Sequence, residues 1–244
     1  MGEFYVGYLP SMPPGIRRRV RAVVAAAVLL AIAGAALFAA SQKQFAESFF
    51  DYGKPAEFSG TIALQPFPTL TAGETHQSPY LLVAPGKHGA DALLAGWDGK
   101  QVRLRGTLIH RIEGRMIEIE SSTITESGSI HVNPAVRTDL GEATLSGEIV
   151  DTKCFLGVMN PGEGKVHRDC AARCRSGGVP PALVTTEIGG TQRIVLLIDE
   201  RGNRLLKLAY LARVGQPVSI HGRLEQSEGL YYLRTSAAEI AVLP

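Results

Sequence analysis

The chain has 244 residues, 45% of them hydrophobic and 20% charged, which excludes a wholly disordered protein. Its three cysteines are too few for a disulfide-dense small domain. Beyond an N-terminal arginine cluster the chain is almost neutral, because residues 41–244 carry 21 basic and 22 acidic side chains. A near-neutral body without a basic stripe argues against nucleic acid as a partner.

Residues 22–40 form a run of 19 uncharged, Ala-rich residues, which is long enough to cross a hydrocarbon core of about 30 Å as a helix. Four arginines between positions 17 and 21 precede it. The positive-inside rule therefore predicts a single-pass protein of the bacterial inner membrane, with a cytoplasmic N-terminus and periplasmic C-terminal domains. A cleaved signal peptide is the alternative, since residues 39–41 are small, but the long preceding segment favours an uncleaved anchor.

The segments on either side of this helix have different compositions. Residues 1–21 are predicted to form a cytoplasmic arm, in which aromatic residues are followed by three prolines. We expect the arm to lie on the membrane interface, where tyrosine is favoured, or to dock on a membrane partner. Residues 41–57 are predicted to be a spacer.

An internal repeat organises the region beyond the spacer. Residues 58–62 (FSGTI) match residues 145–149 (LSGEI) at an offset of 87, and residues 99–108 match residues 215–224 at an offset of 116. Self-similarity of this kind indicates two copies of one folding unit.

Both copies have the alternating apolar pattern of short strands, and each has a short apolar stretch before its Gly-x-x-Val strand. Gly106 and Gly222 interrupt these strands, which commonly marks a bulge or a sharp bend. The patterns predict a mainly β protein with one N-terminal transmembrane helix and two tandem OB-like small β-barrels. The predicted barrels span residues 58–124 and 145–244, with a linker at 125–144; a generic small β-sandwich is the alternative.

The two offsets differ by 29 residues, so the second copy has an insertion, placed at residues 151–184. All three cysteines of the chain lie in it. Because loops on a rigid scaffold tend to carry function, this insertion is the main functional candidate.

The insertion also has a recognisable spacing, in which Asp151 and Cys154 are followed by His167-x₂-Cys170-x₃-Cys174. It resembles exported bacterial proteins that carry a Cys…His-x₂-Cys-x₃-Cys loop on an OB-like domain. The resemblance covers roughly residues 145–240. It implies export and an OB-like fold, and it carries no activity with it.

A metal site is one interpretation of this loop. Cys154, His167, Cys170 and Cys174 would form a Cys₃His set, and the last three would share one face of a helical turn. Such a set suits zinc, and thiolates also suit Cu(I) or iron–sulfur centres. Met159 is available as a further soft ligand.

Two other interpretations remain open. A disulfide from Cys154 to Cys170 or Cys174 would close a loop of roughly 16 to 20 residues, worth about 3 kcal/mol, and would leave one thiol unpaired. Alternatively, one cysteine is a reactive thiol whose pKa is lowered by nearby basic residues. The basic residues near the cysteines in sequence are His167, Lys165, Arg168, Arg173 and Arg175.

No phosphate-binding glycine loop, nucleophile elbow or metalloprotease helix is found in the sequence, and we expect no enzymatic activity. The sequence predicts a membrane-anchored periplasmic accessory or binding subunit of a membrane redox assembly, with a membrane-protein complex as its partner. A metal- or haem-handling chaperone, or a thiol-redox protein, is the alternative.

Overall fold

The fold is described from a computed structural model, which describes residues 11–42, 47–72, 78–111, 114–128 and 136–244. The chain divides into two compact units, residues 1–45 and residues 46–244.

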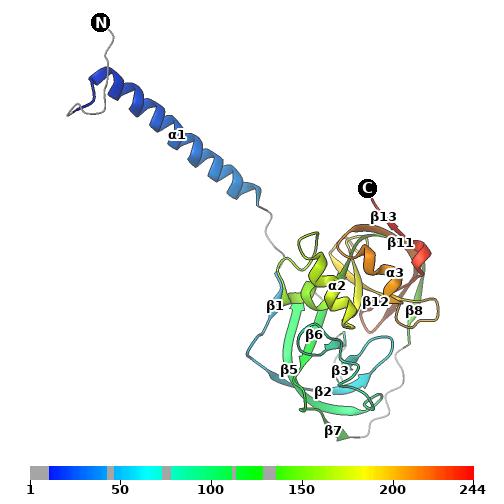
Figure 1. The fold of residues 1–244 in the computed structure, drawn as a ribbon. Coiled ribbons are helices and arrows are strands. Elements are labelled where there is room, and N and C mark those ends of the chain that lie inside the picture. Colours follow the sequence, from blue (N-terminus) through cyan, green and yellow to red (C-terminus); the bar gives the residue numbers. More distant parts are fainter. Residues whose placement is uncertain (1–10, 43–46, 73–77, 112–113, 129–135) are drawn as a thin grey trace. The chain divides into compact units, whose positions relative to one another are not determined.

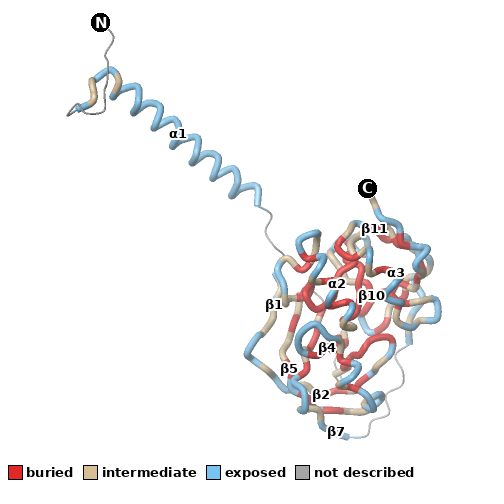
Figure 2. Tube along the Cα trace, in the orientation of Figure 1, coloured by how far each residue is buried: buried red, intermediate tan, exposed pale blue. Residues whose placement is uncertain are grey.

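The first unit contains one long helix, α1 (Pro14–Ser41), with a mean hydropathy of 2.6 over its most apolar window and no buried residue (Figures 1 and 2). By length and composition it could be a membrane span or a signal sequence. It begins at Pro14 rather than at Ala22, because proline is well suited to the first helical position and nothing after it breaks the helix. The arginine cluster is therefore helical, and residues 1–10 of the predicted arm lie outside the described residues.

In the second unit, the first of two closed five-stranded barrels has the strand order β5-β2-β3-β4-β6, with β6 pairing back onto β5. The pair of β4 with β6 is parallel, and the other pairs of the barrel, including the closing pair of β5 with β6, are antiparallel. Two short strands in the predicted spacer and linker, β1 and β7, add to β5. The bounds are β1 (Phe49–Phe50), β2 (Ala56–Ala63), β3 (Thr69–Thr71), β4 (Tyr80–Val83), β5 (Gln101–Arg111), β6 (Gly114–Ile119) and β7 (Thr125–Gly128).

The second barrel has the corresponding order β11-β8-β9-β10-β12, again closed by β12 on β11 and again with a parallel pair, β10 with β12. Its bounds are β8 (Thr138–Asp151), β9 (Pro181–Thr185), β10 (Arg193–Ile198), β11 (Pro217–Ser227), β12 (Leu230–Arg234) and the added β13 (Ile240–Val242). Its short helices are α3 (Lys207–Tyr210), η2 (Leu211–Arg213) and η3 (Ala237–Glu239). The insertion between β8 and β9 forms η1 (Cys154–Val158) and α2 (Arg168–Ser176). The predicted end of the insertion, residue 184, lies inside β9.

Residues aligned by the repeat occupy equal places in the two barrels. Gly60 of β2 is paired with Val102 of β5, and Gly147 of β8 is paired with Val218 of β11. The two offsets in the sequence thus correspond to the same strand pairing, β2 with β5 in the first barrel and β8 with β11 in the second.

The glycines that interrupt the strand pattern lie where the barrels close. Strand β5 leaves β2 and begins to pair with β6 at Gly106, and β11 begins to pair with β12 next to Gly222. A Cβ atom on Gly222 would lie 2.3 Å from the carbonyl oxygen of Arg234, a contact that no side chain tolerates. The β-bulge of β11 lies further on, between Leu224 and Glu225.

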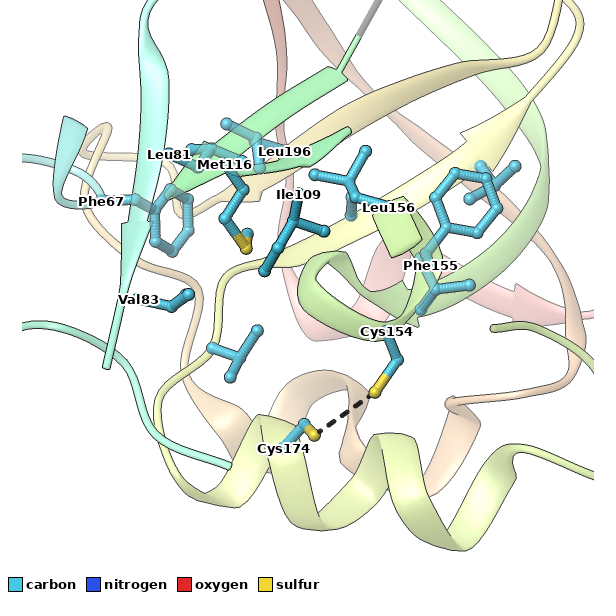
Figure 3. Close-up of a cluster of buried hydrophobic side chains, with 14 of the residues drawn as sticks. Phe67, Leu81, Val83, Ile109, Met116, Cys154, Phe155, Leu156, Cys174 and Leu196 are labelled. Carbon is cyan, nitrogen blue, oxygen red and sulfur yellow. Dashed lines mark hydrogen bonds between the residues drawn. The ribbon is translucent and has the colours of Figure 1, made fainter. Parts of the chain in front are cut away.

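Much of the predicted linker between the barrels forms strands. Strands β7 and β8 take up residues 125–128 and 138–144 of the predicted linker, because both pair with a long strand of a barrel. Of the rest, residues 129–135 lie outside the described part of the chain. One hydrophobic cluster contains side chains of both barrels and of the insertion, as Figure 3 shows. Its members include Phe67, Leu81, Ile109 and Met116 from the first barrel, and Leu196 and Tyr232 from the second.

We predict that Gly222→Ala destabilises the fold by about 1–3 kcal/mol, because the methyl group would collide with backbone rather than with a flexible side chain. Ser219→Ala in the same strand is the matched control and should change stability by less than about 0.5 kcal/mol. Denaturant unfolding of the full chain in detergent measures both variants. Equal stabilities would contradict the close approach of β11 and β12.

Candidate metal centre

The insertion places its three cysteines on two short helices. Cys154 is the first residue of η1, directly after β8, whereas Cys170 and Cys174 lie one turn apart on α2. Phe155 and Leu156, which follow Cys154, are buried in the cluster that the two barrels share. This apolar anchor directs η1 into the junction between the barrels and holds Cys154 over α2.

The three sulfur atoms lie close together without being bonded. The Sγ atom of Cys154 is 3.8 Å from that of Cys174, the contact drawn as a dashed line in Figure 3. It is 4.0 Å from that of Cys170, and all three sulfurs lie within 4.8 Å of one another. A disulfide needs about 2.05 Å, and all three cysteines are free. The spacing fits three sulfurs around one ion, because metal–sulfur bonds of about 2.3 Å place sulfurs about 3.8–4.0 Å apart. The group could therefore hold a metal ion.

His167, the fourth predicted ligand, belongs to a second group. Its Nε2 atom lies 3.1 Å from Oδ2 of Asp151, and both side chains are buried. The other carboxylate oxygen of Asp151 accepts the backbone N–H of Cys154 at 2.8 Å. A second group of possible ligands therefore consists of Asp151, Cys154 and His167. It shares Cys154 with the group of three cysteines, here called the thiol group. In this arrangement His167 helps to fix the carboxylate that holds Cys154 in place.

A lysine from the first barrel lies against the thiols. Nζ of Lys87 donates to Sγ of Cys170 at 2.7 Å and lies 3.9 Å from Sγ of Cys174. Lys87 is in the loop of residues 84–89, here called the strap, which follows β4. The backbone N–H of Gly89 in the strap donates to the carbonyl oxygen of Gly177, just after α2, at 3.0 Å. The first barrel thus supplies one wall of a site built by the second.

A buried lysine fixes the other end of the strap. Lys153, next to Cys154 and only 2% exposed, donates from Nζ to the carbonyl oxygens of Ala84 at 2.9 Å and Gly86 at 2.6 Å. The same ammonium forms an ion pair with Glu118 of β6. A buried ammonium is stable only where its donors are satisfied, and here the strap satisfies two of them.

These charges act on the thiols. The pKa of Cys174 is lowered, first by its hydrogen bond with Cys154, and also by the ammonium groups of Lys87 and Lys153. The pKa of Cys154 is raised by that same hydrogen bond, by burial and by the charge of Asp151. Cys174 is therefore the member of this pair that loses its proton first. The pKa of Lys87 is raised, chiefly by its hydrogen bond to Cys170, so this lysine stays charged.

Arg175 is a second buried cation beside the centre. Only 3% of it is exposed, its Nη2 atom donates to the hydroxyl of Tyr210, and burial lowers its pKa. Its Nε and Nη1 atoms have no hydrogen-bond partner among the described residues. Its positive charge faces Cys174 and Asp151 closely enough to interact with both.

The structure brings together three of the four predicted ligands, and it shows two residues that the sequence did not indicate. Each of Lys87 and Lys153 contacts residues of the other barrel, and no local sequence pattern predicts which residues meet where the barrels dock. The other basic residues expected to influence the thiols, Lys165, Arg168 and Arg173, are exposed, and so is Met159. Comparisons with protein-family models, curated proteins and solved structures gave no match to this chain.

We predict that Cys170 reacts with iodoacetamide at least about tenfold faster than the other two cysteines in reduced, metal-free protein. Cys154 and Cys174 are only 2% and 1% exposed, whereas Cys170 is partly exposed beneath Lys87. Peptide mass spectrometry of a labelling time course on the full chain measures the three rates, with fully denatured protein as the control. Equal rates in the folded chain would contradict the burial of the thiol pair.

Proposed function

We propose that this chain is a membrane-anchored protein whose second barrel binds a thiophilic metal ion through Cys154, Cys170 and Cys174. The observation that carries the proposal is the convergence of three free sulfurs to within 4.8 Å of one another. Thiolates in this arrangement are the ligands preferred by zinc, Cu(I) and iron–sulfur centres.

The charges around the sulfurs support binding of a cation by thiolates. Three thiolates carry three negative charges, which exceed the charge of a monovalent or divalent ion. The ammonium of Lys87 donates to Sγ of Cys170, and that of Lys153 lies close enough to lower the pKa of Cys174, so both offset part of the excess. Asp151 accepts the backbone N–H of Cys154, and His167 contacts the same carboxylate. In this proposal neither residue coordinates the metal, and both orient a ligand, which is the usual role of residues around a metal site.

The membrane and fold assignments belong to the same proposal. We assign α1 as an uncleaved anchor with its N-terminus in the cytoplasm, because its arginines precede its apolar run. We assign both barrels as OB-like, in tandem, because each has five strands in the same closed order with one parallel pair. The resemblance to exported bacterial proteins with a similar cysteine loop agrees with a periplasmic location.

A bound thiolate metal centre beside a membrane suits an accessory subunit of a membrane redox assembly. Its own residues would hold and shield the ion, and the membrane partner would supply any reaction. The main alternative is a thiol-redox protein, which the contact of Lys87 with Cys170 favours, since a cation beside a sulfur stabilises the thiolate. A metal- or haem-handling chaperone is a further alternative.

We predict that the full chain, purified in detergent under reducing conditions, binds about one metal ion per chain. Cys170→Ser should weaken binding by at least about tenfold, because it removes one of three ligands at a partly exposed position that tolerates the change. Elemental analysis with a thiol count measures the effect.

Met159→Leu is the matched control for this experiment, because Met159 lies in the same insertion but is 44% exposed, and it should retain the metal. Absence of metal from the wild-type chain, with two thiols that react only after reduction, would contradict the proposal and support a disulfide.

A further inference from the structure

The thiol group offers three ligands and lacks a fourth. Within the described residues, the groups able to hold a metal ion are the three cysteines and the triplet Asp151, Cys154 and His167. The chain holds only three cysteines, one fewer than the four thiolates that bind common iron–sulfur clusters. Zinc in structural sites almost always takes four ligands as a tetrahedron. The ion that the site prefers therefore depends on whether any group can fill a fourth coordination position.

His167 is not placed to complete a tetrahedron. Its Nε2 atom is engaged by Asp151 at 3.1 Å, and it groups with Cys154 but not with Cys170 and Cys174. Both Asp151 and His167 are buried, so a reorientation toward the thiols would leave a buried carboxylate without this partner. The side chain of Met159, the other soft candidate, is largely in solvent.

The side chain that approaches the sulfurs from the first barrel is a cation, Lys87, and not a fourth ligand. The ammonium of Lys87 lies 2.7 Å from Cys170 and 3.9 Å from Cys174. A protonated amine has three N–H donors and no lone pair, so it cannot coordinate a metal. The strap keeps it there, because Lys153 and Gly177 bind the strap backbone on both sides of Lys87.

We propose, on the basis of the metal-binding function above, that the thiol group is a three-coordinate site selective for Cu(I), with Lys87 as its counter-cation. Cu(I) is soft and selects thiolate ligands. A planar set of three sulfurs with bonds of about 2.3 Å requires sulfur separations of about 4.0 Å. The two separations from Cys154, 3.8 Å and 4.0 Å, are compatible with this geometry, and the lack of a fourth ligand beside the three cysteines among the described residues favours it over a tetrahedron.

Binding requires no electron transfer. Each of the three thiols loses its proton to solvent, one metal–sulfur bond forms at each sulfur, and copper remains in the +1 state. The resulting centre carries a charge of −2, and the ammonium of Lys87, which donates to Sγ of Cys170, offsets part of it.

The test uses the full reduced chain in detergent, without oxygen. Cu(I) is titrated against the chromogenic chelator bicinchoninate, Zn²⁺ is titrated against a zinc indicator, and the copper-loaded protein is examined by X-ray absorption. We expect one Cu(I) per chain, three sulfur neighbours, no nitrogen neighbour, and displacement of Zn²⁺ by one equivalent of Cu(I).

Two outcomes overturn the inference in different ways. One tightly held Zn²⁺ that resists Cu(I), or a copper spectrum that includes nitrogen, refutes the three-coordinate Cu(I) site and leaves the metal-binding function standing. Failure to bind either ion refutes both proposals.

Variants of the strap test the role of Lys87. Lys87→Gln should weaken Cu(I) binding about two- to fivefold, because it removes a charge that solvent screens at an exposed position and retains a hydrogen-bond donor. Lys87→Arg keeps the charge and should stay within about twofold of the wild type. His88→Ala, at the neighbouring exposed position, is the matched control and should bind as the wild type does. Equal affinities of Lys87→Gln and wild type would refute the counter-cation.

Discussion

The buried ammonium of Lys153 is the interaction on which the candidate centre depends. It donates to two carbonyl oxygens of the strap and pairs with Glu118, so one side chain of the second barrel is satisfied entirely by the first. Loss of these partners would leave a charge in an apolar junction, which is strongly unfavourable. Cys154, the next residue, therefore keeps its place above α2 only while the barrels are docked.

The docking also has an apolar component. Phe155 and Leu156 of η1 pack in the cluster that joins both barrels, and Cys154 and Cys174 belong to the same cluster. The thiols are thus part of a packed core as well as part of a polar site. A core of this kind resists rearrangement, since small changes in volume are costly, and it preorganises the sulfurs at spacings suited to one ion.

Much of this architecture could be predicted from the sequence. The apolar run indicated α1, and the repeat indicated two barrels, because strand alternation and glycine spacing are local signals. Cys170 and Cys174 were predicted to lie together for a local reason, since they are one helical turn apart, whereas the approach of Cys154 was one of three open interpretations. The place of His167 was not predictable, because its partner Asp151 lies 16 residues away across a Gly/Pro-rich loop. The contact of Lys87 with Cys170, 83 residues apart, depends on barrel docking, which no sequence period encodes.

The repeat explains why the centre occurs once although the barrel occurs twice. The hairpin that forms the strap has a counterpart in the second barrel, because the bond from Ala84 N–H to His88 O corresponds to the bond from Asp199 N–H to Asn203 O. The position equivalent to Lys87 is Gly202, which carries no charge and lies near no cysteine. The shared scaffold therefore supplies the shape of the strap, whereas the chemistry comes from two local departures: a lysine in the first copy and an insertion in the second. The insertion supplies the three sulfurs and the first copy supplies the cation that contacts them, so the candidate centre is built by both barrels.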